Sequence, residues 1–248
     1  MRLPIAIQLY TLRDELDKDF IGTLEKVAKI GYEGVEFAGY GNIPATTMKS
    51  HLERLNLKVA GAHVSLERLQ NTLLEEIEYN KIIGNKYIVC PWTKFETMQQ
   101  YLECAALLEG IGTTLKHHSL ELVYHNHAHE FELFGGMYGL DILFSNTIES
   151  TLKAEIDTYW VEYANVNSTQ YLKKLTNRCP LIHQKDMDNT TKRGFTELGT
   201  GVLDLKKMYR TYQEIGVEWY IVEQDECTIP PLESIEISYN NLKKMGLA

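Results

Sequence analysis

The sequence of 248 residues has no dense run of lysine or arginine and no long apolar run. Its formal net charge is -9. Proteins that bind nucleic acid usually carry a basic patch, so DNA or RNA is a poor candidate for a partner. A membrane-spanning helix needs about 18 consecutive apolar residues, and the sequence contains no such run. The apolar stretch at the N-terminus is too short for a signal peptide. We therefore expect a cytoplasmic protein with no nucleic-acid or membrane partner.

Two familiar motifs are also missing. The four cysteines are scattered and form no Cys-x-x-Cys pair, which indicates structural thiols in a reducing compartment. No Gly-x-Gly-x-x-Gly sequence follows the first apolar run, so nothing favours a dinucleotide site there. The chain also has no linker, low-complexity stretch or short repeat, and we expect a single domain over residues 1–248.

Short apolar runs alternate with segments of helical periodicity along the whole chain. The predicted strands are 5–9, 34–37, 58–63, 86–91, 119–124, 152–156, 180–183 and 219–223. The predicted helices are 20–30, 46–55, 66–83, 93–114, 140–146, 168–177, 203–215 and 231–245, with loops at 127–136 and 186–201. This alternation predicts an α/β fold, a closed parallel (β/α)8 barrel, and an open doubly wound sheet is the alternative.

The ends of the last four predicted strands carry residues that a divalent metal binds. Barrel enzymes have their sites at the C-terminal ends of the strands, where these side chains would converge. Two imidazoles and two carboxylates suit manganese, cobalt, iron or zinc. The sequence therefore predicts one divalent metal ion held by His125, Asp157, His183 and Glu223.

Polar and aromatic residues at other strand ends are candidates for substrate binding and catalysis. Residues two apart on a strand face the same way, so Lys185 would point with His183, and His127 with His125. A simpler interpretation exists for each of these residues: a plug of the barrel end, a core hydrogen bond or an ordinary salt bridge. The candidates for substrate binding are Tyr10, Glu36 and Trp92, and the candidates for catalysis are Glu223, His63, Lys185 and His127.

Several motifs resemble the xylose-isomerase-like superfamily of TIM barrels over nearly the whole chain. The fairly specific ones are Tyr124-His-Asn-His-Ala-His-Glu-Phe131 and Ile182-His-Gln-Lys-Asp186. Supporting stretches lie at 7–13, 34–37, 61–63, 198–204 and 222–225. The group includes sugar-phosphate isomerases and epimerases, tagatose-type 3-epimerases, inosose dehydratases, dehydroshikimate dehydratases and endonuclease IV. The resemblance implies a metal-dependent enzyme of carbohydrate metabolism using manganese, zinc, cobalt or magnesium.

The chain departs from the family pattern at one metal ligand. Asp157, His183 and Glu223 match the usual Asp, His and Glu, but His125 stands where a glutamate is expected. In the epimerases two glutamates exchange protons across the substrate, and this chain retains only Glu223 of that pair. A histidine (His63, His125 or His127) is the candidate for the second acid or base, because imidazole titrates near neutral pH.

The leading hypothesis is a sugar or sugar-phosphate isomerase or epimerase that abstracts a proton next to a carbonyl. The second is a lyase, a dehydratase of an inosose-like or 3-keto-sugar substrate, because elimination needs one base and one acid. The third is a barrel that binds carbohydrate without turning it over. Endonuclease activity ranks last, since the chain is acidic and such enzymes need more metal ligands. The sequence leaves open whether the protein is a homo-oligomer.

Overall fold

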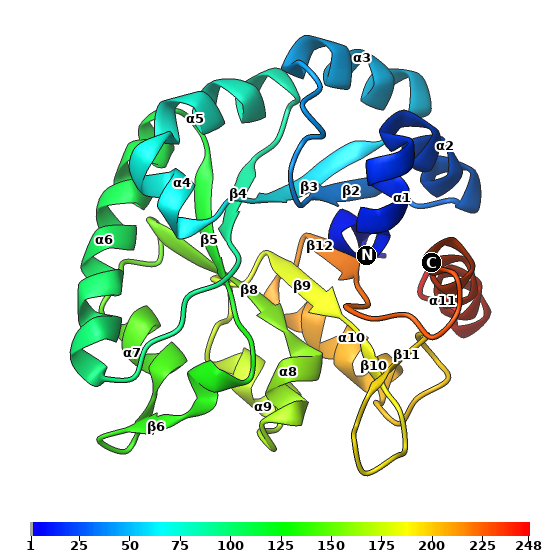
Figure 1. The fold of residues 1–248 in the computed structure, drawn as a ribbon. Helices are drawn as coiled ribbons and strands as arrows, with labels where there is room; N and C mark the ends of the chain where they lie inside the picture. Colours follow the sequence, from blue (N-terminus) through cyan, green and yellow to red (C-terminus); the bar gives the residue numbers. More distant parts are fainter. Residues whose placement is uncertain (1) are drawn as a thin grey trace.

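A computed structural model describes residues 2–248 as a closed barrel of parallel strands surrounded by helices (Figure 1). The strand order around the barrel is β1-β12-β9-β8-β5-β4-β3-β2, so the first barrel strand pairs with the last. The barrel strands are β1 (Ile5–Gln8), β2 (Gly34–Phe37), β3 (Lys58–His63), β4 (Tyr87–Cys90), β5 (Glu121–His125), β8 (Leu152–Asp157), β9 (Leu181–Gln184) and β12 (Trp219–Val222). The predicted single-domain (β/α)8 barrel is confirmed.

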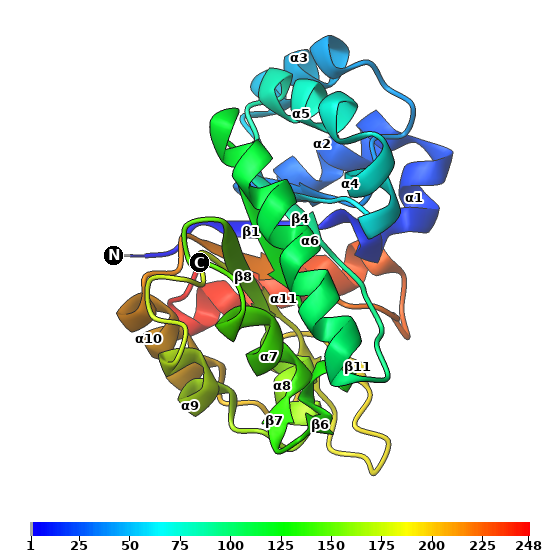
Figure 2. The same cartoon turned by 90° about the vertical axis from the view of Figure 1, so that its left-hand side faces the viewer.

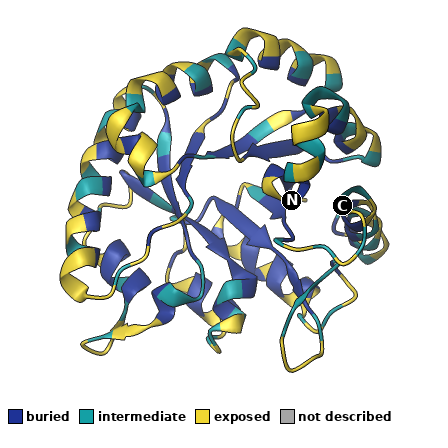
Figure 3. Ribbon diagram, viewed as in Figure 1, coloured by how far each residue is buried: buried dark blue, intermediate teal, exposed yellow. Residues whose placement is uncertain are grey.

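The helices cover the outside of the barrel. Their outward faces are exposed and their inward faces are buried against the strands (Figure 3). They are α1 (Arg13–Lys18), α2 (Phe20–Ile30), α3 (Ala45–Leu55), α4 (Leu66–Asn71), α5 (Leu73–Ile82), α6 (Met98–His117), α7 (Gly139–Ser145), α8 (Thr158–Tyr163), α9 (Ser168–Lys173), α10 (Leu205–Ile215) and α11 (Pro231–Met245), with short 3-10 turns η1 (Leu9–Leu12) and η2 (His129–Phe131). In the part of the chain that is described, no helix is long and apolar enough to cross a membrane.

Several predicted segments differ in the structure. The predicted helix 66–83 is broken at Thr72, whose hydroxyl donates to the Arg68 carbonyl oxygen at 3.1 Å and ends α4 there. The predicted helix 93–114 begins only at Met98, because Thr97 and Gln100 form a reciprocal capping box at its N-terminus. The predicted loop 186–201 contains a short hairpin of β10 (Asp186–Met187) and β11 (Phe195–Thr196). A second hairpin, β6 (Leu133–Phe134) with β7 (Met137–Tyr138), begins in the predicted loop 127–136 and ends beyond it.

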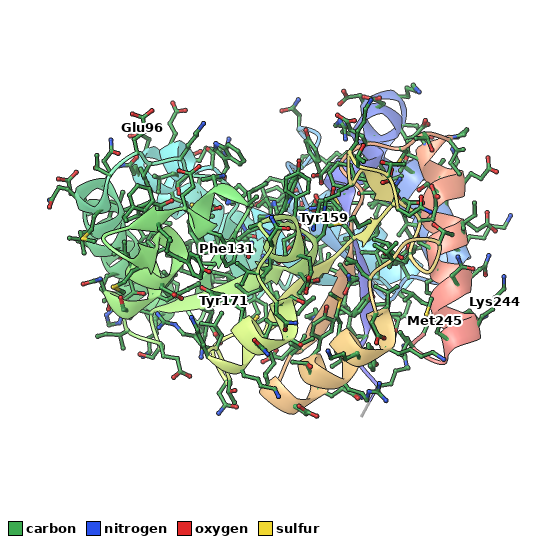
Figure 4. The ribbon with its side chains drawn as sticks, turned by 90° about the horizontal axis from the view of Figure 1, so that it is seen from below. Glu96, Phe131, Tyr159, Tyr171, Lys244 and Met245 are labelled. Atoms are coloured by element: carbon green, nitrogen blue, oxygen red, sulfur yellow. The ribbon has the colours of Figure 1, made fainter. Side chains whose placement is uncertain are left out.

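Two separate apolar clusters hold the molecule together. The larger one lies between the strands and the helices, and α6 runs along the outside of the barrel as part of it (Figure 2). On its rim, the rings of Phe131 and Tyr171 meet edge to face with centroids 5.1 Å apart (Figure 4). The smaller cluster fills the barrel interior with residues from alternate strand positions: Ala6, Ala60, Tyr87, Val89, Val123, Leu181 and Ile221.

The interior cluster determines where along the barrel axis the polar site lies. Because side chains alternate between the two faces of a strand, the next inward residue lies two positions further along. On four strands this next residue is polar, which gives the pairs Ala6 and Gln8, Val123 and His125, Leu181 and His183, and Ile221 and Glu223. The polar side chains therefore form the next layer above the interior apolar cluster, toward the C-terminal ends of the strands.

Candidate active site and metal centre

The four predicted metal ligands meet at the C-terminal mouth of the barrel. His125 and Asp157 are the last residues of β5 and β8, His183 lies in β9, and Glu223 directly follows β12. One donor atom from each lies within 4.8 Å of every other, and all four side chains are buried. Bonds of about 2.0–2.2 Å to a tetrahedral zinc place the donors roughly 3.5 Å apart, so this set fits a divalent cation after small adjustments.

Each of the two imidazoles in this set lies between carboxylates on both sides. His183 Nδ1 is 2.8 Å from Glu223 Oε2, and His183 Nε2 is 2.5 Å from Glu36 Oε2. His125 Nδ1 is 3.0 Å from Glu155 Oε2, and its Nε2 is 4.0 Å from Asp157 Oδ2. We call Asp157, Lys185, Glu223 and Asp225 the outer cluster, and Glu36, His63 and Glu155 the inner cluster.

The outer cluster is built around Lys185. Its buried ammonium contacts Asp157 Oδ2, lies 2.7 Å from Glu223 Oε2 and lies 3.1 Å from Asp225 Oδ1. Burial alone lowers the pKa of Lys185, but the three carboxylates raise it well above its usual range. Lys185 is therefore charged, and its ammonium also lies 5.7 Å from the centroid of the Trp160 ring.

The inner cluster holds two fully buried carboxylates. His63 Nε2 lies 3.2 Å from Glu36 Oε2 and 3.0 Å from Glu155 Oε2. Burial lowers the pKa of His63, but Glu36 and Glu155 outweigh it and raise this pKa to about 9. Burial and the neighbouring charge of Glu36 raise the pKa of Glu155. Each carboxylate keeps one buried oxygen, Oε1, without a hydrogen-bond partner among the described residues.

The charges of the two clusters favour a bound cation. Five carboxylates, those of Glu36, Glu155, Asp157, Glu223 and Asp225, lie around Lys185 and three imidazoles. Burial raises the pKa of Asp157, and in Asp225 it raises the pKa to about 6. Burial lowers the pKa of His125 well below its usual range, so this imidazole is neutral and offers a lone pair. Excess buried negative charge beside a neutral imidazole is the environment that a divalent cation stabilises.

Aromatic and histidine rings form one wall of the site. The His127 ring lies 4.5 Å from the Trp92 ring and 5.8 Å from the Trp160 ring, measured between centroids. Trp92 is 52% exposed, whereas His127 Nδ1 and Trp160 Nε1 are buried without a hydrogen-bond partner in residues 2–248. Trp160 is held by Asp157, whose Oδ1 accepts its backbone N–H at 3.2 Å as the N-cap of α8.

The Glu130 carboxylate holds the loop after β5 in place through hydrogen bonds. One carboxylate oxygen accepts the backbone N–H of His127 at 2.8 Å, and the other accepts the Tyr124 hydroxyl at 2.9 Å. His129 Nε2 reaches the carbonyl oxygen of Thr93 at 2.6 Å. The motif His-Asn-His-x-His-Glu-Phe thus places His127 on the wall of the site and uses Glu130 to hold it.

The residues predicted to bind metal or substrate or to act in catalysis fall into three groups by their position in the structure. His125, Asp157, His183, Glu223, Lys185 and His63 lie in or between the two clusters, with Glu36 beside them. His127 and Trp92 lie on the wall. Tyr10 is 46% exposed on the rim, where Arg13 lies 4.4 Å from its ring and donates to the Asp225 carbonyl oxygen at 3.1 Å.

Sequence reasoning missed Glu155, Asp225 and Trp160 as site residues. Glu155 precedes Asp157 by two positions, and Asp225 follows Glu223 by two. The alternation of a strand puts Glu155 on the same face as Asp157, so the period of two was the available signal. Trp160 carried no such signal, because its place depends on the helix that Asp157 caps.

Known proteins share this architecture with the chain at low sequence identity. No protein-family model matches the chain. It is 22% identical over 262 residues to an inosose dehydratase of Clostridium beijerinckii, covering 88% of this chain and 86% of that protein.

Solved structures show the same fold. A sugar phosphate isomerase/epimerase from Parabacteroides distasonis superposes with a TM-score of 0.84 at 21% identity, covering 97% of both chains. The IOLI protein with a bound zinc atom superposes with a TM-score of 0.76 at 14% identity, covering 98% of this chain and 97% of that one. At these identities the likeness shows the fold alone, a closed (β/α)8 barrel, and the bound zinc atom of the IOLI protein is compatible with a divalent metal in the cluster of this chain.

Proposed function

We propose that the protein is a divalent-metal-dependent enzyme that removes a proton next to the carbonyl of a sugar-like polyhydroxy ketone, with loss of water as the favoured outcome. One observation carries the proposal. Beside a buried set of metal-type donors, the charged Lys185 and the unpartnered His127 Nδ1 both lie against Trp160. An acid and a proton acceptor next to a cation position are what elimination of water requires.

The metal would be held by His125, Asp157, His183 and Glu223. When bound, it polarises the carbonyl oxygen of the substrate and stabilises the negative charge that develops there. Asp157 Oδ2 and Glu223 Oε2 are also the oxygens that Lys185 contacts. The buried ammonium therefore neutralises charge next to the cation position, and we assign it as the proton donor to a substrate hydroxyl.

Burial, together with the charge of Lys185, lowers the pKa of His127 to about 3, so the ring is neutral and weakly basic. It is the candidate for the proton acceptor because its Nδ1 is free in the described chain. Glu223 Oε2 already lies within hydrogen-bond distance of both His183 and Lys185, whereas His127 Nδ1 has no partner in residues 2–248. We assign the step as follows. His127 takes the proton from the carbon next to the carbonyl, a carbon–carbon double bond forms, and the hydroxyl on the adjacent carbon leaves as water with a proton from Lys185. A later proton exchange with solvent restores both side chains.

Isomerisation or epimerisation is the second candidate. It shares the first step and differs in that a proton returns to carbon without loss of water. The superposition on a sugar phosphate isomerase/epimerase favours it. Dehydration ranks first for two reasons: the curated relatives are inosose dehydratases, and a second glutamate is replaced by His125.

The wall of the site would hold the substrate ring. Trp92 is 52% exposed, so a sugar-like ring can pack on it, and Tyr10 lies on the rim. The buried Trp160 Nε1 donor has no partner in the described chain and suits a substrate hydroxyl oxygen.

The proposal is tested with an inosose or a 3-keto-sugar, manganese-loaded protein and D₂O. We expect exchange of the C–H proton next to the carbonyl, followed by an unsaturated ketone, both seen by NMR. His127→Gln should reduce the exchange by about 10²-fold or more, the usual effect of removing a general base. Glu223→Gln keeps an oxygen donor and should instead weaken metal binding.

Three results would redirect or overturn the proposal. Exchange that survives in His127→Gln but is lost in metal-replete Glu223→Gln would move the base to Glu223. Exchange without any unsaturated product would favour the isomerase or epimerase. Substrate binding with no exchange at all in manganese-loaded wild-type protein would leave only a carbohydrate-binding barrel.

A further inference from the structure

Glu155 is the meeting point of three imidazoles. Its Oε2 lies 3.0 Å from His63 Nε2, 3.0 Å from His125 Nδ1 and 3.3 Å from His183 Nε2. The side chain is fully buried and rises from β8 one inward position below Asp157. A carboxylate oxygen only accepts hydrogen bonds, so each ring nitrogen that bonds to it must carry a hydrogen.

This contact decides which nitrogen of His125 can bind a cation. With the hydrogen on Nδ1 and directed at Glu155, the lone pair is on Nε2. Nε2 is the nitrogen that faces the outer cluster, 4.0 Å from Asp157 Oδ2. Glu155 therefore leaves His125 with its lone pair on the side of the proposed metal.

The same argument applies to His183. Its Nε2 lies between Glu36 Oε2 at 2.5 Å and Glu155 Oε2 at 3.3 Å, so this nitrogen carries a hydrogen. Nδ1 faces the outer cluster at 2.8 Å from Glu223 Oε2, so without a metal it carries a hydrogen as well. A cation bound there would replace that hydrogen, while Nε2 would keep its own between Glu36 and Glu155. Glu36 is itself held by Gln8, which donates to Oε2 at 2.8 Å. Gly61 lies against it, since a Cβ there would come within 2.3 Å of Glu36 Oε1.

The inner cluster does not suit a second cation of its own. His63, His125, Glu155 and His183 do offer donors within 4.8 Å of one another. However, a neutral imidazole has one lone pair, so His125 and His183 cannot serve both positions at once. The three nitrogens also surround an oxygen atom rather than an open point.

We propose that Glu155, assisted by Glu36, is a positioning residue that fixes the ring orientation and hydrogen placement of His125 and His183, so that His125 Nε2 and His183 Nδ1 face the metal. This inference rests on the proposed metal site. Carboxylates that accept the second N–H of a ligating histidine commonly change metal affinity about 10- to 100-fold when they are removed.

The test compares Glu155→Gln and Glu36→Gln with wild-type protein. Affinity for Mn²⁺ or Zn²⁺ is measured by competition with a chromophoric chelator. We expect affinity to fall about 10- to 100-fold in both variants while the stoichiometry stays at one metal per chain. Asp157→Asn should lose binding more completely. Glu76→Gln, a buried carboxylate that pairs with Arg68 instead, is the control and should bind metal normally.

A second readout does not depend on metal. Long-range ¹H–¹⁵N spectra of the metal-free protein report which nitrogen of His125 carries its hydrogen. We expect Nδ1–H in wild-type protein and in Glu76→Gln, and an increased share of Nε2–H in Glu155→Gln. A purely structural role for Glu155 would lower stability without moving this signal.

The outcomes separate the two ideas. Wild-type protein that binds no metal removes the proposed function, and the inference with it. Normal wild-type binding with unchanged affinity and hydrogen placement in Glu155→Gln overturns the inference alone. Binding that survives in Asp157→Asn but disappears in His63→Gln and Glu155→Gln would place the cation in the inner cluster, and this also overturns it.

Discussion

Asp186 connects the site strand β9 to the long loop that follows it. Its Oδ2 accepts the backbone N–H groups of Gly199 at 2.9 Å and Gly201 at 3.0 Å. Its Oδ1 accepts the N–H groups of Met187 at 2.9 Å and Leu203 at 3.2 Å. A single buried carboxylate therefore holds both ends of the segment 187–203. The Asp of the His-x-Lys-Asp motif orders the loop, while the Lys enters the site.

We expect Asp186→Ala to leave that loop open to proteolysis, because four backbone N–H groups lose their acceptor and each unsatisfied group costs about 1–3 kcal/mol. Trypsin cleaves after lysine and arginine, and Lys192 is exposed in this loop. Limited trypsin digestion followed by mass spectrometry should show faster cleavage after Lys192 than in wild-type protein.

Asp188→Ala is the matched control for this experiment. The Asp188 side chain bonds within the loop, to the backbone N–H and hydroxyl of Thr190 at 2.9 and 2.7 Å. Its removal should change the cleavage rate much less. Equal rates in the two variants would show that Asp186 does not hold the loop.

At the residue scale, the sequence predicts which polar residues lie at the strand ends, but it does not predict which of them contact one another across the barrel. His125, Asp157, His183 and Glu223 could be predicted because each ends an apolar run at the same mouth. The contact of His183 Nε2 with Glu36 joins residues 147 positions apart, and no local pattern encodes such a contact. It follows from the strand order and register, which only the closed barrel defines.

At the scale of single elements, α6 contains two glycines with opposite surroundings. A Cβ on Gly112 would lie 2.0 Å from the backbone carbonyl oxygen of Thr151, so this face of the helix touches the loop before β8. A Cβ on Gly110 would meet no atom within 4 Å. The two positions are two residues apart in the same helix, which makes them a direct comparison of packing against helix propensity.

We expect Gly112→Ala to destabilise the protein by about 1–3 kcal/mol, because the obstructing atom belongs to the backbone and cannot rotate away. Gly110→Ala should stabilise it by about 0.5–1 kcal/mol, the usual gain of alanine over glycine within a helix. Thermal unfolding followed by circular dichroism measures both. Changes of the same sign in the two variants would contradict this account of α6.

Elements with a strong period and clear caps could be predicted from the sequence. The last helix, α11, matches its predicted bounds of 231–245, with proline at its start and Gly246 at its end. The helix α8 was missed because it is only six residues long and starts from the site residue Asp157. Its N-cap is a side chain that sequence reasoning had assigned to a metal.

At the scale of the whole molecule, the reactivity of the cysteines is a measure of whether the barrel is folded. Cys90, Cys104 and Cys179 are buried, and Cys227 is partly exposed. Burial raises the pKa of Cys104 to about 12 and raises the pKa values of Cys90 and Cys179 as well. The thiolate is the reactive form, so these three thiols are protected by both burial and protonation.

We expect a thiol reagent such as DTNB at neutral pH to label Cys227 first in native protein and the other three only as the protein unfolds. Cys227→Ser should therefore remove most of the labelling under native conditions, while four thiols react in denatured wild-type protein. Rapid labelling of Cys90 or Cys179 in native protein would mean that the barrel opens far more easily than its packing indicates.

The pairing of β1 with β12 also has a consequence during synthesis on the ribosome. Ile7 is opposite Val222 in the finished barrel, so this edge of β1 stays free until β12 has been made. At about 5–20 residues per second, this wait lasts on the order of 10–40 s. Unpaired strand edges are templates for aggregation, and a nascent chain of this protein is a natural client for chaperones during that interval. Because Glu223 follows β12, a cation at the proposed site would find all four donors only after that interval has ended.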